Sequence, residues 1–254
     1  MENYNPFSLK GKTILVTGAS SGIGQATAVE CSKLGATVII TARNQEKLNE
    51  TFQMLRSDGQ IHQQILADIT KDEDIQNLID NLPKIDGLVN NAGIVFLKPL
   101  LFYTRECIEE ILQTNLISQM LITKAVVKGK KIKKNGSIVF TSSIGGVYSV
   151  SIANGIYAAA KNGIDAFMRT AALELGAKGI RVNSVNPGMT ETKLAVNDND
   201  LSEEDYEKDK KTYVLGRYGQ PQEIALGIIY LLSDASAWVT GIALKIDGGK
   251  TLSC

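Results

Sequence analysis

The sequence predicts a single-domain α/β fold, in which one doubly wound, seven-stranded parallel sheet is flanked by helices. Short apolar runs alternate with longer helical stretches along the whole of residues 1–254, and no repeat or low-complexity tract marks a second domain. This alternation is typical of parallel strands joined by crossover helices. The first run leads into a glycine-rich turn, and small or polar residues follow several later runs. Because the carboxyl ends of parallel strands meet at one edge of a sheet, these residues are expected to form one ligand site.

Composition excludes several functional classes. Lys+Arg and Asp+Glu are both 27, giving a formal charge of +0, so the charge balance suggests neither nucleic acid nor an anionic membrane as partner. Cys31, Cys107 and Cys254 are too few and too scattered for a disulfide framework or a zinc site. A reducing, cytoplasmic location is expected. The N-terminus lacks the apolar segment of a signal peptide, and the longest apolar run, residues 224–232, is too short to span a bilayer.

The first strand, residues 13–17, is a buried β-branched run that leads into Gly18-Ala-Ser-Ser-Gly-Ile-Gly24 and then a helix over 25–34. Backbone N–H groups at such a helix start bind phosphate, helped by the helix dipole. The Gly-x3-Gly-x-Gly spacing only approximates the general dinucleotide fingerprint. We therefore predict phosphate binding at this turn, and the alternative is a turn with no ligand.

The second strand, residues 37–41, ends just before Arg43. In a βαβ nucleotide fold this strand end meets the adenosine ribose, where an acid bonds both hydroxyls and an arginine attracts a 2′-phosphate. No acid stands at Thr41 or Ala42. The sequence thus favours NADP(H) over NAD(H), unless Arg43 only caps a surface loop.

The third strand is predicted over residues 61–69, after an amphipathic helix over 45–58. Asp68, near its end, either meets the adenine amino group or caps the helix that begins near Lys71. The only histidine, His62, lies at the opposite end of this strand, so histidine catalysis is not expected.

The fourth strand, residues 85–89, ends in Asn90-Asn-Ala-Gly93, whose small and amide residues allow close approach of a flat ligand or form a plain turn. A long helix over about 105–128 carries Asn115 within an apolar run. A buried asparagine needs partners, so Asn115 is either a structural brace or a polar member of the site. Lysines are concentrated within residues 128–134. They form either a solvated cap that the helix dipole favours or a docking site for an acidic carrier.

The fifth strand, residues 137–141, leads to Ser143 and to a helix that carries Tyr157 and Lys161 and ends near Gly176. Tyr157 and Lys161 are one turn apart and share a helix face. A phenol has a pKa of about 10, which a nearby ammonium lowers. Tyr157 would then exchange a proton with an alcohol or carbonyl whose oxygen Ser143 also binds. The alternative is a solvated pair. The many small residues of this helix suggest close packing, including packing between subunits.

The sixth strand, residues 180–186, ends at Pro187-Gly-Met-Thr-Glu-Thr192. Residues 193–213 are too charged for a core, and their place after a strand end predicts a lid over about 190–215. Pro221 opens a last helix, and residues 242–246 form the seventh strand.

These motifs together resemble the short-chain dehydrogenase/reductase family over essentially the whole chain. They are Thr17-Gly18-x3-Gly22-Ile23-Gly24, Asn90-Asn91-Ala92-Gly93, Asn115, Ser143-x2-Gly146, Tyr157-x3-Lys161 and Pro187-Gly188-x3-Thr192. The tail, residues 216–225 and 247–249, is similar to the branch of 3-oxoacyl-carrier-protein reductases and many sugar, steroid and alcohol dehydrogenases. Ser143 lies one residue farther from Tyr157 than is usual in the family, which makes the intervening loop the uncertain part.

The resemblance implies a Rossmann fold and hydride transfer, without a metal, between a nicotinamide and a carbonyl or secondary alcohol. It implies a catalytic set of Ser143, Tyr157, Lys161 and Asn115. It implies cofactor contacts from Gly18, Ser20, Ser21, Gly22, Ile23, Gly24, Arg43, Asp68, Ile69, Asn91, Ala92, Gly93, Tyr157, Lys161, Pro187, Gly188, Thr190 and Thr192.

The expected reaction is NADPH-dependent reduction of a 3-oxoacyl thioester or similar ketone. Val147, Tyr148, Ile152, Met189 and Leu194 suggest a partly apolar pocket. The alternatives are a sugar, steroid or other secondary-alcohol dehydrogenase, or an NADP-binding sensor or scaffold without activity. Expected partners are a small carbonyl or alcohol substrate and further copies of the chain in a tetramer or dimer, and an acyl carrier protein is left open.

Overall fold

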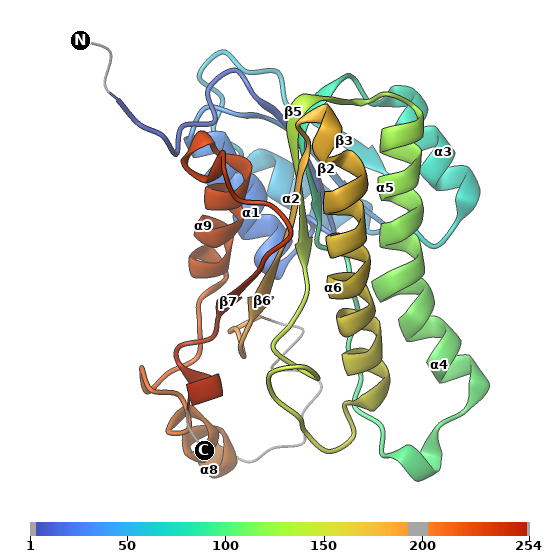
Figure 1. The fold of residues 1–254 in the computed structure, drawn as a ribbon, viewed down its shortest axis with the longest axis vertical. Helices are drawn as coiled ribbons and strands as arrows, with labels where there is room; N and C mark the ends of the chain where they lie inside the picture. Colours follow the sequence, from blue (N-terminus) through green and yellow to red (C-terminus); the bar gives the residue numbers. More distant parts are fainter. Residues whose placement is uncertain (1–3, 193–202, 253–254) are drawn as a thin grey trace.

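The computed structural model describes residues 4–192 and 203–252, which fold around one parallel sheet (Figure 1). The seven strands lie in the order β3-β2-β1-β4-β5-β6-β7. Their bounds are β1 Thr13–Thr17, β2 Thr37–Ala42, β3 Gln63–Leu66, β4 Ile85–Asn90, β5 Ile132–Thr141, β6 Arg181–Pro187 and β7 Ala243–Ile246. The chain starts in the middle, winds out to β3, returns to β4 beside β1, and winds out to β7. The predicted doubly wound sheet is confirmed.

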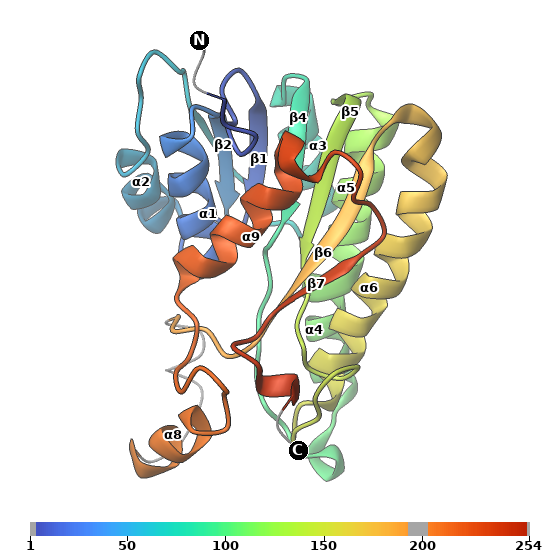
Figure 2. The ribbon, with the colours of Figure 1, turned by 60° about the vertical axis from the view of Figure 1, so that its left-hand side comes forward.

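Helices cover both faces of the sheet (Figure 2). One face is covered by α1 Gly22–Lys33, α2 Gln45–Gln53 and α9 Pro221–Leu232. The other is covered by α3 Asp72–Asn81, α5 Ser118–Lys128 and α6 Gly155–Leu175. Strand β1 illustrates this arrangement, because its side chains alternate between the two faces. Ile14 and Val16 pack on the face covered by α1, α2 and α9, Leu15 packs on the other face, and all three are fully buried.

Two helices lie toward the carboxyl edge of the sheet, α4 Arg105–Leu112 and α8 Glu203–Lys210 (Figure 1). The predicted helix over 105–128 contains a turn of π-helix, Gln113–Ile117, between α4 and α5. Asn115 lies in this turn and is fully buried. A π turn inserts one residue into the helical repeat and is frequent at functional sites.

The third strand is shorter than predicted. It covers Gln63–Leu66, and Ile61, which we had placed in the strand, is 80% exposed. The reason is that β3 is the edge strand and pairs with β2 alone, at Gln63–Leu66.

Several small residues of α6 pack against other parts of the same chain, whereas the sequence also suggested packing between subunits. Ala160, Ala171 and Ala172 are buried, and a Cβ on Gly163 would lie 3.0 Å from Leu116 Cδ2. Two other small residues of α6, Ala159 and Ala166, are exposed.

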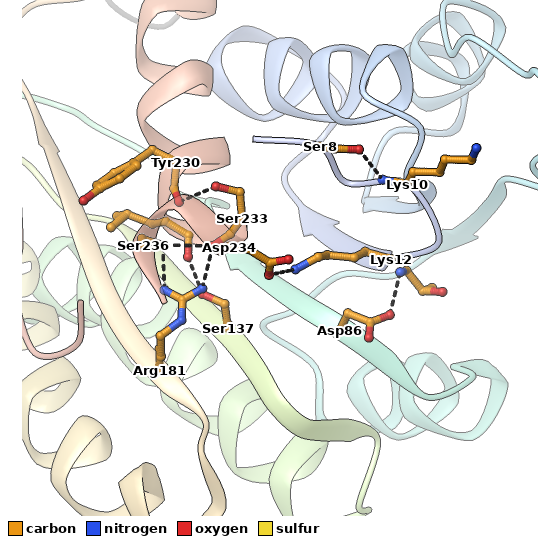
Figure 3. A network of polar contacts seen from close by, with 12 residues as sticks. Ser8, Lys10, Lys12, Asp86, Ser137, Arg181, Tyr230, Ser233, Asp234 and Ser236 are labelled. Carbon is orange, nitrogen blue, oxygen red and sulfur yellow. Dashed lines mark hydrogen bonds and ion pairs between the residues drawn. The ribbon is translucent and has the colours of Figure 1, made fainter. Parts of the chain in front are cut away.

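A polar network holds the amino ends of the central strands together (Figure 3). Arg181 donates to Ser236 Oγ at 2.8 Å and to the carbonyl of Ser233 at 3.2 Å. Lys12 pairs with Asp234 at 2.6 Å, and Asp86 accepts from the N–H of Thr13 at 2.8 Å. These contacts close the edge of the sheet opposite to the predicted site.

The lysine run also lies at that opposite edge, at the end of α5 and the start of β5. Lys131 donates to the carbonyl of Leu82 at 2.6 Å, and Lys133 pairs with Asp86 at 2.7 Å. Lys134, the last lysine of the run, precedes the carboxyl end of β5 at Thr141 by seven residues, which is about 23 Å at about 3.3 Å per residue. A carrier docked on these lysines would sit far from the predicted site, so this position favours the structural interpretation.

No helix within residues 4–192 or 203–252 has the length and apolar character needed to cross a membrane. The same described residues contain no cluster of His, Cys, Asp and Glu that could hold a metal ion.

Candidate active site

A pocket of about 900 Å³ opens at the carboxyl ends of the strands. It is lined by nearly all the residues predicted for the site, namely Gly18, Ser20, Ser21, Gly22, Ile23, Arg43, Asp68, Ile69, Asn91, Ala92, Gly93, Ser143, Tyr157, Lys161, Pro187, Gly188, Thr190 and Thr192. Gly24 and Asn115 do not line it. The sheet topology therefore brings together segments that are far apart in the sequence.

The glycine turn lies against the end of β4. Gly18 has a φ of +64°, and a Cβ there would lie 2.6 Å from Ala92 Cα. Only glycine fits this combination of conformation and close approach. A Cβ on Gly24 would fall on the carbonyl oxygen of Gly18 and on Asn91 Nδ2. Gly24 therefore has a packing role, because α1 must approach the turn closely, and its contact with a cofactor stays a prediction.

Thr17, at the end of β1, holds the β4 end in place. Its fully buried hydroxyl donates to the carbonyl of Val89 at 3.2 Å and accepts from the N–H groups of Asn91 at 3.0 Å and Ala92 at 3.2 Å. The Asn91 amide in turn donates to the carbonyls of Thr17 at 3.2 Å and Gly18 at 3.3 Å. We had not assigned Thr17 a role, because nothing in the sequence indicates that a hydroxyl at this position has partners more than seventy residues away.

Asn115 fixes the backbone of the segment that follows β4. Its Oδ1 accepts from the N–H of Ile94 at 2.8 Å, and its Nδ2 donates to the carbonyl of Ile94 at 2.7 Å. A Cβ on Gly93 would lie 3.1 Å from Asn115 Oδ1 and 3.5 Å from Lys161 Nζ. The structural brace that we raised as one alternative is confirmed. The other alternative, a part for Asn115 in the site, stays a prediction, because Asn115 does not line the pocket.

Cations line the pocket at the end of β2. Arg43 is joined there by Lys47, which we had not predicted and which lies in the first turn of α2. Asn44 begins that helix by accepting from the N–H of Lys47 at 2.9 Å. Arg43 precedes α2, so helical spacing does not relate the two cations, and the sequence signal for the second one was a lysine in the first turn of the helix that follows Arg43.

Asp68 also lines this part of the pocket, and it does not cap α3, whose N-cap residue is Lys71. Instead it accepts from the hydroxyl of Thr70 at 2.7 Å and the N–H of Thr70 at 3.0 Å. Burial opposes ionisation of Asp68, but these hydrogen bonds and the charges of Lys71 and Arg43 hold its pKa below its usual value.

The proposed reactive groups meet where β5 ends and α6 begins. The Ser143 hydroxyl lies near that of Tyr157 and lowers its pKa, and Ser143 Oγ accepts from the N–H of Gly145 at 3.0 Å. Lys161 Nζ donates to the carbonyl of Thr141 at 2.7 Å and lies 5.6 Å from the centre of the Tyr157 ring. The extra residue between Ser143 and Tyr157 therefore does not separate them. The intervening loop folds back on itself through a bridge between Gly145 and Ser149.

The pKa of Tyr157 differs from our expectation. We expected Lys161 to lower it, but burial raises the pKa of Tyr157 to about 12, and the Ser143 hydroxyl offsets only part of that rise. Burial also lowers the pKa of Lys161 to about 8, while the negative charge of Asp165 acts in the opposite direction. The prediction was wrong in this structure because loss of hydration on burial dominates the pKa of Tyr157, and Lys161 contributes no lowering that offsets it.

Part of the predicted lid lines the pocket too. Asp209 and Tyr213 reach it, and Tyr213 accepts from the N–H of Met189 at 3.0 Å. Lys250, outside the predicted lid, reaches the pocket as well. Residues 193–202 of the predicted lid, including Leu194, lie outside the described residues. Lys250 follows the sheet's last strand, and no sequence pattern placed it near the pocket.

Comparison with known proteins agrees with this geometry. The family model described as Enoyl-(Acyl carrier protein) reductase matches residues 18–251. A 3-oxoacyl-[acyl-carrier-protein] reductase of Pseudomonas aeruginosa is 35% identical over 250 residues, covering 97% of this chain and 100% of that protein. A tropinone reductase homolog of Arabidopsis thaliana is 33% identical over 262 residues, covering 99% of this chain and 96% of the other.

Comparison with solved structures gives the same result. The crystal structure of a short-chain type dehydrogenase/reductase from Mycobacterium marinum matches with a TM-score of 0.88 at 31% identity, covering 97% of this chain and 98% of that one. The chain therefore belongs to the short-chain dehydrogenase/reductase family of oxidoreductases, in the branch that includes the 3-oxoacyl-[acyl-carrier-protein] reductases.

Proposed function

We propose that this protein uses NADPH to reduce a ketone to a secondary alcohol, and that the ketone is a 3-oxoacyl thioester or a similar compound with an apolar chain. The observation that carries the proposal is the convergence of Ser143, Tyr157 and Lys161 in the pocket that the glycine turn also lines. The relative from Pseudomonas aeruginosa, a 3-oxoacyl-[acyl-carrier-protein] reductase, supports the choice of substrate class.

The residues of the pocket fit a dinucleotide. Glycines occupy positions where a side chain would be too close to a neighbouring segment. At Gly18 a Cβ would clash with Ala92, and at Gly22 it would lie 3.2 Å from Thr192. We propose that the turn holds the pyrophosphate at the start of α1. Asp68, Asn91 and the segment Pro187–Thr192 would hold the adenine, its ribose and the carboxamide end.

We propose that Arg43 and Lys47 bind a 2′-phosphate. Both cations line the pocket at the end of β2, and no acid stands at Thr41 or Ala42. A second cation strengthens the preference for NADP(H) inferred from Arg43, since each charged hydrogen bond contributes about 1.5–3 kcal/mol.

A bound nicotinamide supplies the hydride that the carbonyl carbon accepts. Ser143 and Tyr157 would both donate hydrogen bonds to the carbonyl oxygen. With a pKa raised to about 12, the Tyr157 hydroxyl is protonated at neutral pH and serves as the general acid for the developing alkoxide. Lys161 would place a positive charge beside the phenol and hold the nicotinamide ribose.

The mouth of the pocket supports a substrate with an apolar chain. Leu97 and Val150 line the pocket and are 45% and 85% exposed. The N–H of Lys98 donates to the carbonyl of Ala153 at 2.9 Å and so joins the two loops that carry them. Ile152, on the same loop as Val150, is 90% exposed. Contiguous exposed apolar side chains of this kind mark binding surfaces.

The substrate proposal is tested by following NADPH absorbance with a short and a long 3-oxoacyl thioester, a cyclic ketone and a sugar ketone. We expect kcat/KM to be highest for the thioesters and to rise with chain length. Higher activity with the cyclic ketone or sugar would assign one of the alternative dehydrogenase activities.

The cofactor proposal is tested with Arg43→Ala and Lys47→Ala. We expect KM for NADPH to rise roughly 10- to 100-fold, from the loss of a charged hydrogen bond, and KM for NADH to change little. Arg56→Ala is the matched control, because Arg56 is exposed and pairs with Asp58 outside the pocket. Equal effects on both cofactors would remove the proposed phosphate site.

The acid is tested with Tyr157→Phe, which removes only the hydroxyl. We expect kcat to fall by about 10²- to 10⁴-fold, while NADPH binding, followed by its fluorescence, stays nearly intact. Unchanged turnover would reject Tyr157 as the acid. A wild-type protein that binds NADPH but reduces no ketone would favour the sensor or scaffold alternative.

We further propose a homo-oligomer, formed through the faces of the long helices. Ile117 is 40% exposed, and Ala159 and Ala166 are exposed on α6. Sedimentation velocity should give a dimer or tetramer, and Ala166→Arg should shift it toward the monomer. A cytoplasmic location likewise stays a prediction, and the free thiols of Cys31 and Cys107 accord with it.

A further inference from the structure

Two charged residues are buried in α6. Lys161 is 3% exposed and Asp165 is 2% exposed. Tyr157, Lys161 and Asp165 follow one another at intervals of four residues, so they form a stripe on one helix face that runs from the pocket into the core. The reaction proposed above uses the first two and leaves Asp165 without a role.

The partners of Asp165 fit an ionised carboxylate. Ser184 Oγ donates to its Oδ1 at 2.7 Å, and Asn186 Nδ2 donates to its Oδ2 at 2.7 Å. An ionised carboxylate only accepts hydrogen bonds, so these two donors suit that form. A buried charge with neutral partners needs a compensating charge nearby, and Lys161 stands one turn away on the same helix.

Asn186 extends this network to the reactive serine. The same Nδ2 that donates to Asp165 also donates to the carbonyl of Ser143 at 2.9 Å. Both hydrogens of the amide are thereby used, and the end of β6 is fixed against the end of β5. Ser142 Oγ adds a bond to the carbonyl of Lys161 at 3.0 Å. A displacement at Asp165 would therefore reach Ser143 through one side chain.

We propose that Asp165 is a positioning residue of the reaction, which keeps Lys161 charged at neutral pH and holds Ser143 in register with Tyr157 through Asn186. This inference rests on the proposed function, because it assigns Asp165 a part in the same proton transfer.

The surroundings of Lys161 single out Asp165 as its source of negative charge. On α6 the titratable groups near Lys161 are Tyr157 and Asp165. From β5 it meets the carbonyl of Thr141, and from the loop after β4 it meets Gly93, both uncharged. Burial lowers the pKa of Lys161 to about 8 and Asp165 raises it. Without that charge, Lys161 loses its proton at a lower pH.

The decisive experiment uses Asp165→Asn, which keeps the size of the side chain and removes its charge. The pKa of Lys161 is measured by NMR on protein labelled at lysine Cε, with the resonance assigned from Lys161→Met. Two charges one helical turn apart, about 6 Å at an effective dielectric constant of about 20, predict a pKa about one to two units lower. The alkaline limb of the kcat/KM profile should move by the same amount.

Asp86→Asn is the matched control. Asp86 is likewise a hydrogen-bonded carboxylate near a lysine, since it accepts from the N–H of Thr13 and pairs with Lys133, but it lies at the opposite edge of the sheet. Its loss should lower stability and leave both the pKa of Lys161 and the alkaline limb in place. An unchanged Lys161 pKa in Asp165→Asn, or an equal shift in Asp86→Asn, would overturn the proposal.

Asn186→Ala tests the link to Ser143 and keeps the proposal open to refutation if Asp165→Asn does not fold. It preserves the charge of Asp165, so kcat should fall about tenfold or more while the alkaline limb stays in place. Unchanged kcat would overturn the link. The NMR titration needs no substrate, so a shifted Lys161 pKa in a protein that reduces no ketone would reject the proposed function and leave the coupling between the two charges standing.

Discussion

Thr17→Val gives the sharpest test of how the pocket is built, since it exchanges one hydroxyl for a methyl group at a fully buried position. The substitution leaves the N–H groups of Asn91 and Ala92 and the carbonyl of Val89 without the partner they have in the wild type. Each unsatisfied buried group costs about 1–3 kcal/mol. Because Asn91 and Ala92 are half-buried, we expect the low end for each, and a total loss of about 2–3 kcal/mol.

The assay is urea unfolding followed by circular dichroism, with the free energy of unfolding extrapolated to water. Thr17→Ser is the matched control, because it keeps the hydroxyl and loses one buried methyl group, which costs about 1 kcal/mol. Thr17→Val should also raise KM for the cofactor more than Thr17→Ser does, since the β4 end moves. A valine variant as stable as the serine variant would refute the reasoning.

Three further changes follow from the same structure. Gly24→Ala should raise KM for NADPH and lower stability, because a Cβ would fall on the carbonyl of Gly18, and steady-state kinetics with thermal unfolding measures both. Reductase activity of the wild type should fall as pH rises through about 8, where Lys161 loses its proton, and a profile flat to pH 10 would contradict this assignment. Glu223 pairs with Arg217 at 2.6 Å, and this pair lowers the pKa of Glu223 from 4.5 to about 2. A carboxyl whose pKa is lowered by folding stabilises the protein above its unfolded pKa. Glu223→Gln should therefore be less stable than wild type at pH 7, and urea unfolding should show the difference vanish as pH falls from about 4.5 to about 2.

Much of the fold and of the candidate site could be predicted because their signals are local. The β-branched run before Gly18 predicts a strand, the turn that follows predicts a helix start, and Pro221 opens α9 as expected. In a doubly wound sheet the carboxyl ends of the strands share one edge. The position of each motif within its own segment was therefore enough to predict that the motifs meet in one pocket.

Groups whose behaviour depends on distant segments could not be predicted. Thr17 finds its partners more than seventy residues away, at Val89, Asn91 and Ala92. Lys250 reaches the pocket only because the chain turns back after β7.

The sequence by itself determined the order of the elements and predicted the class of ligand at the strand ends and the reactive groups, because each of these follows from neighbours along the chain. Only the tertiary structure decided the charge states. Burial raises the pKa of Tyr157 and lowers that of Lys161, and the polar partners of Asp165 come from β6. Hydration and electrostatic attraction depend on what surrounds a group in space, and no pattern along the chain specifies those surroundings.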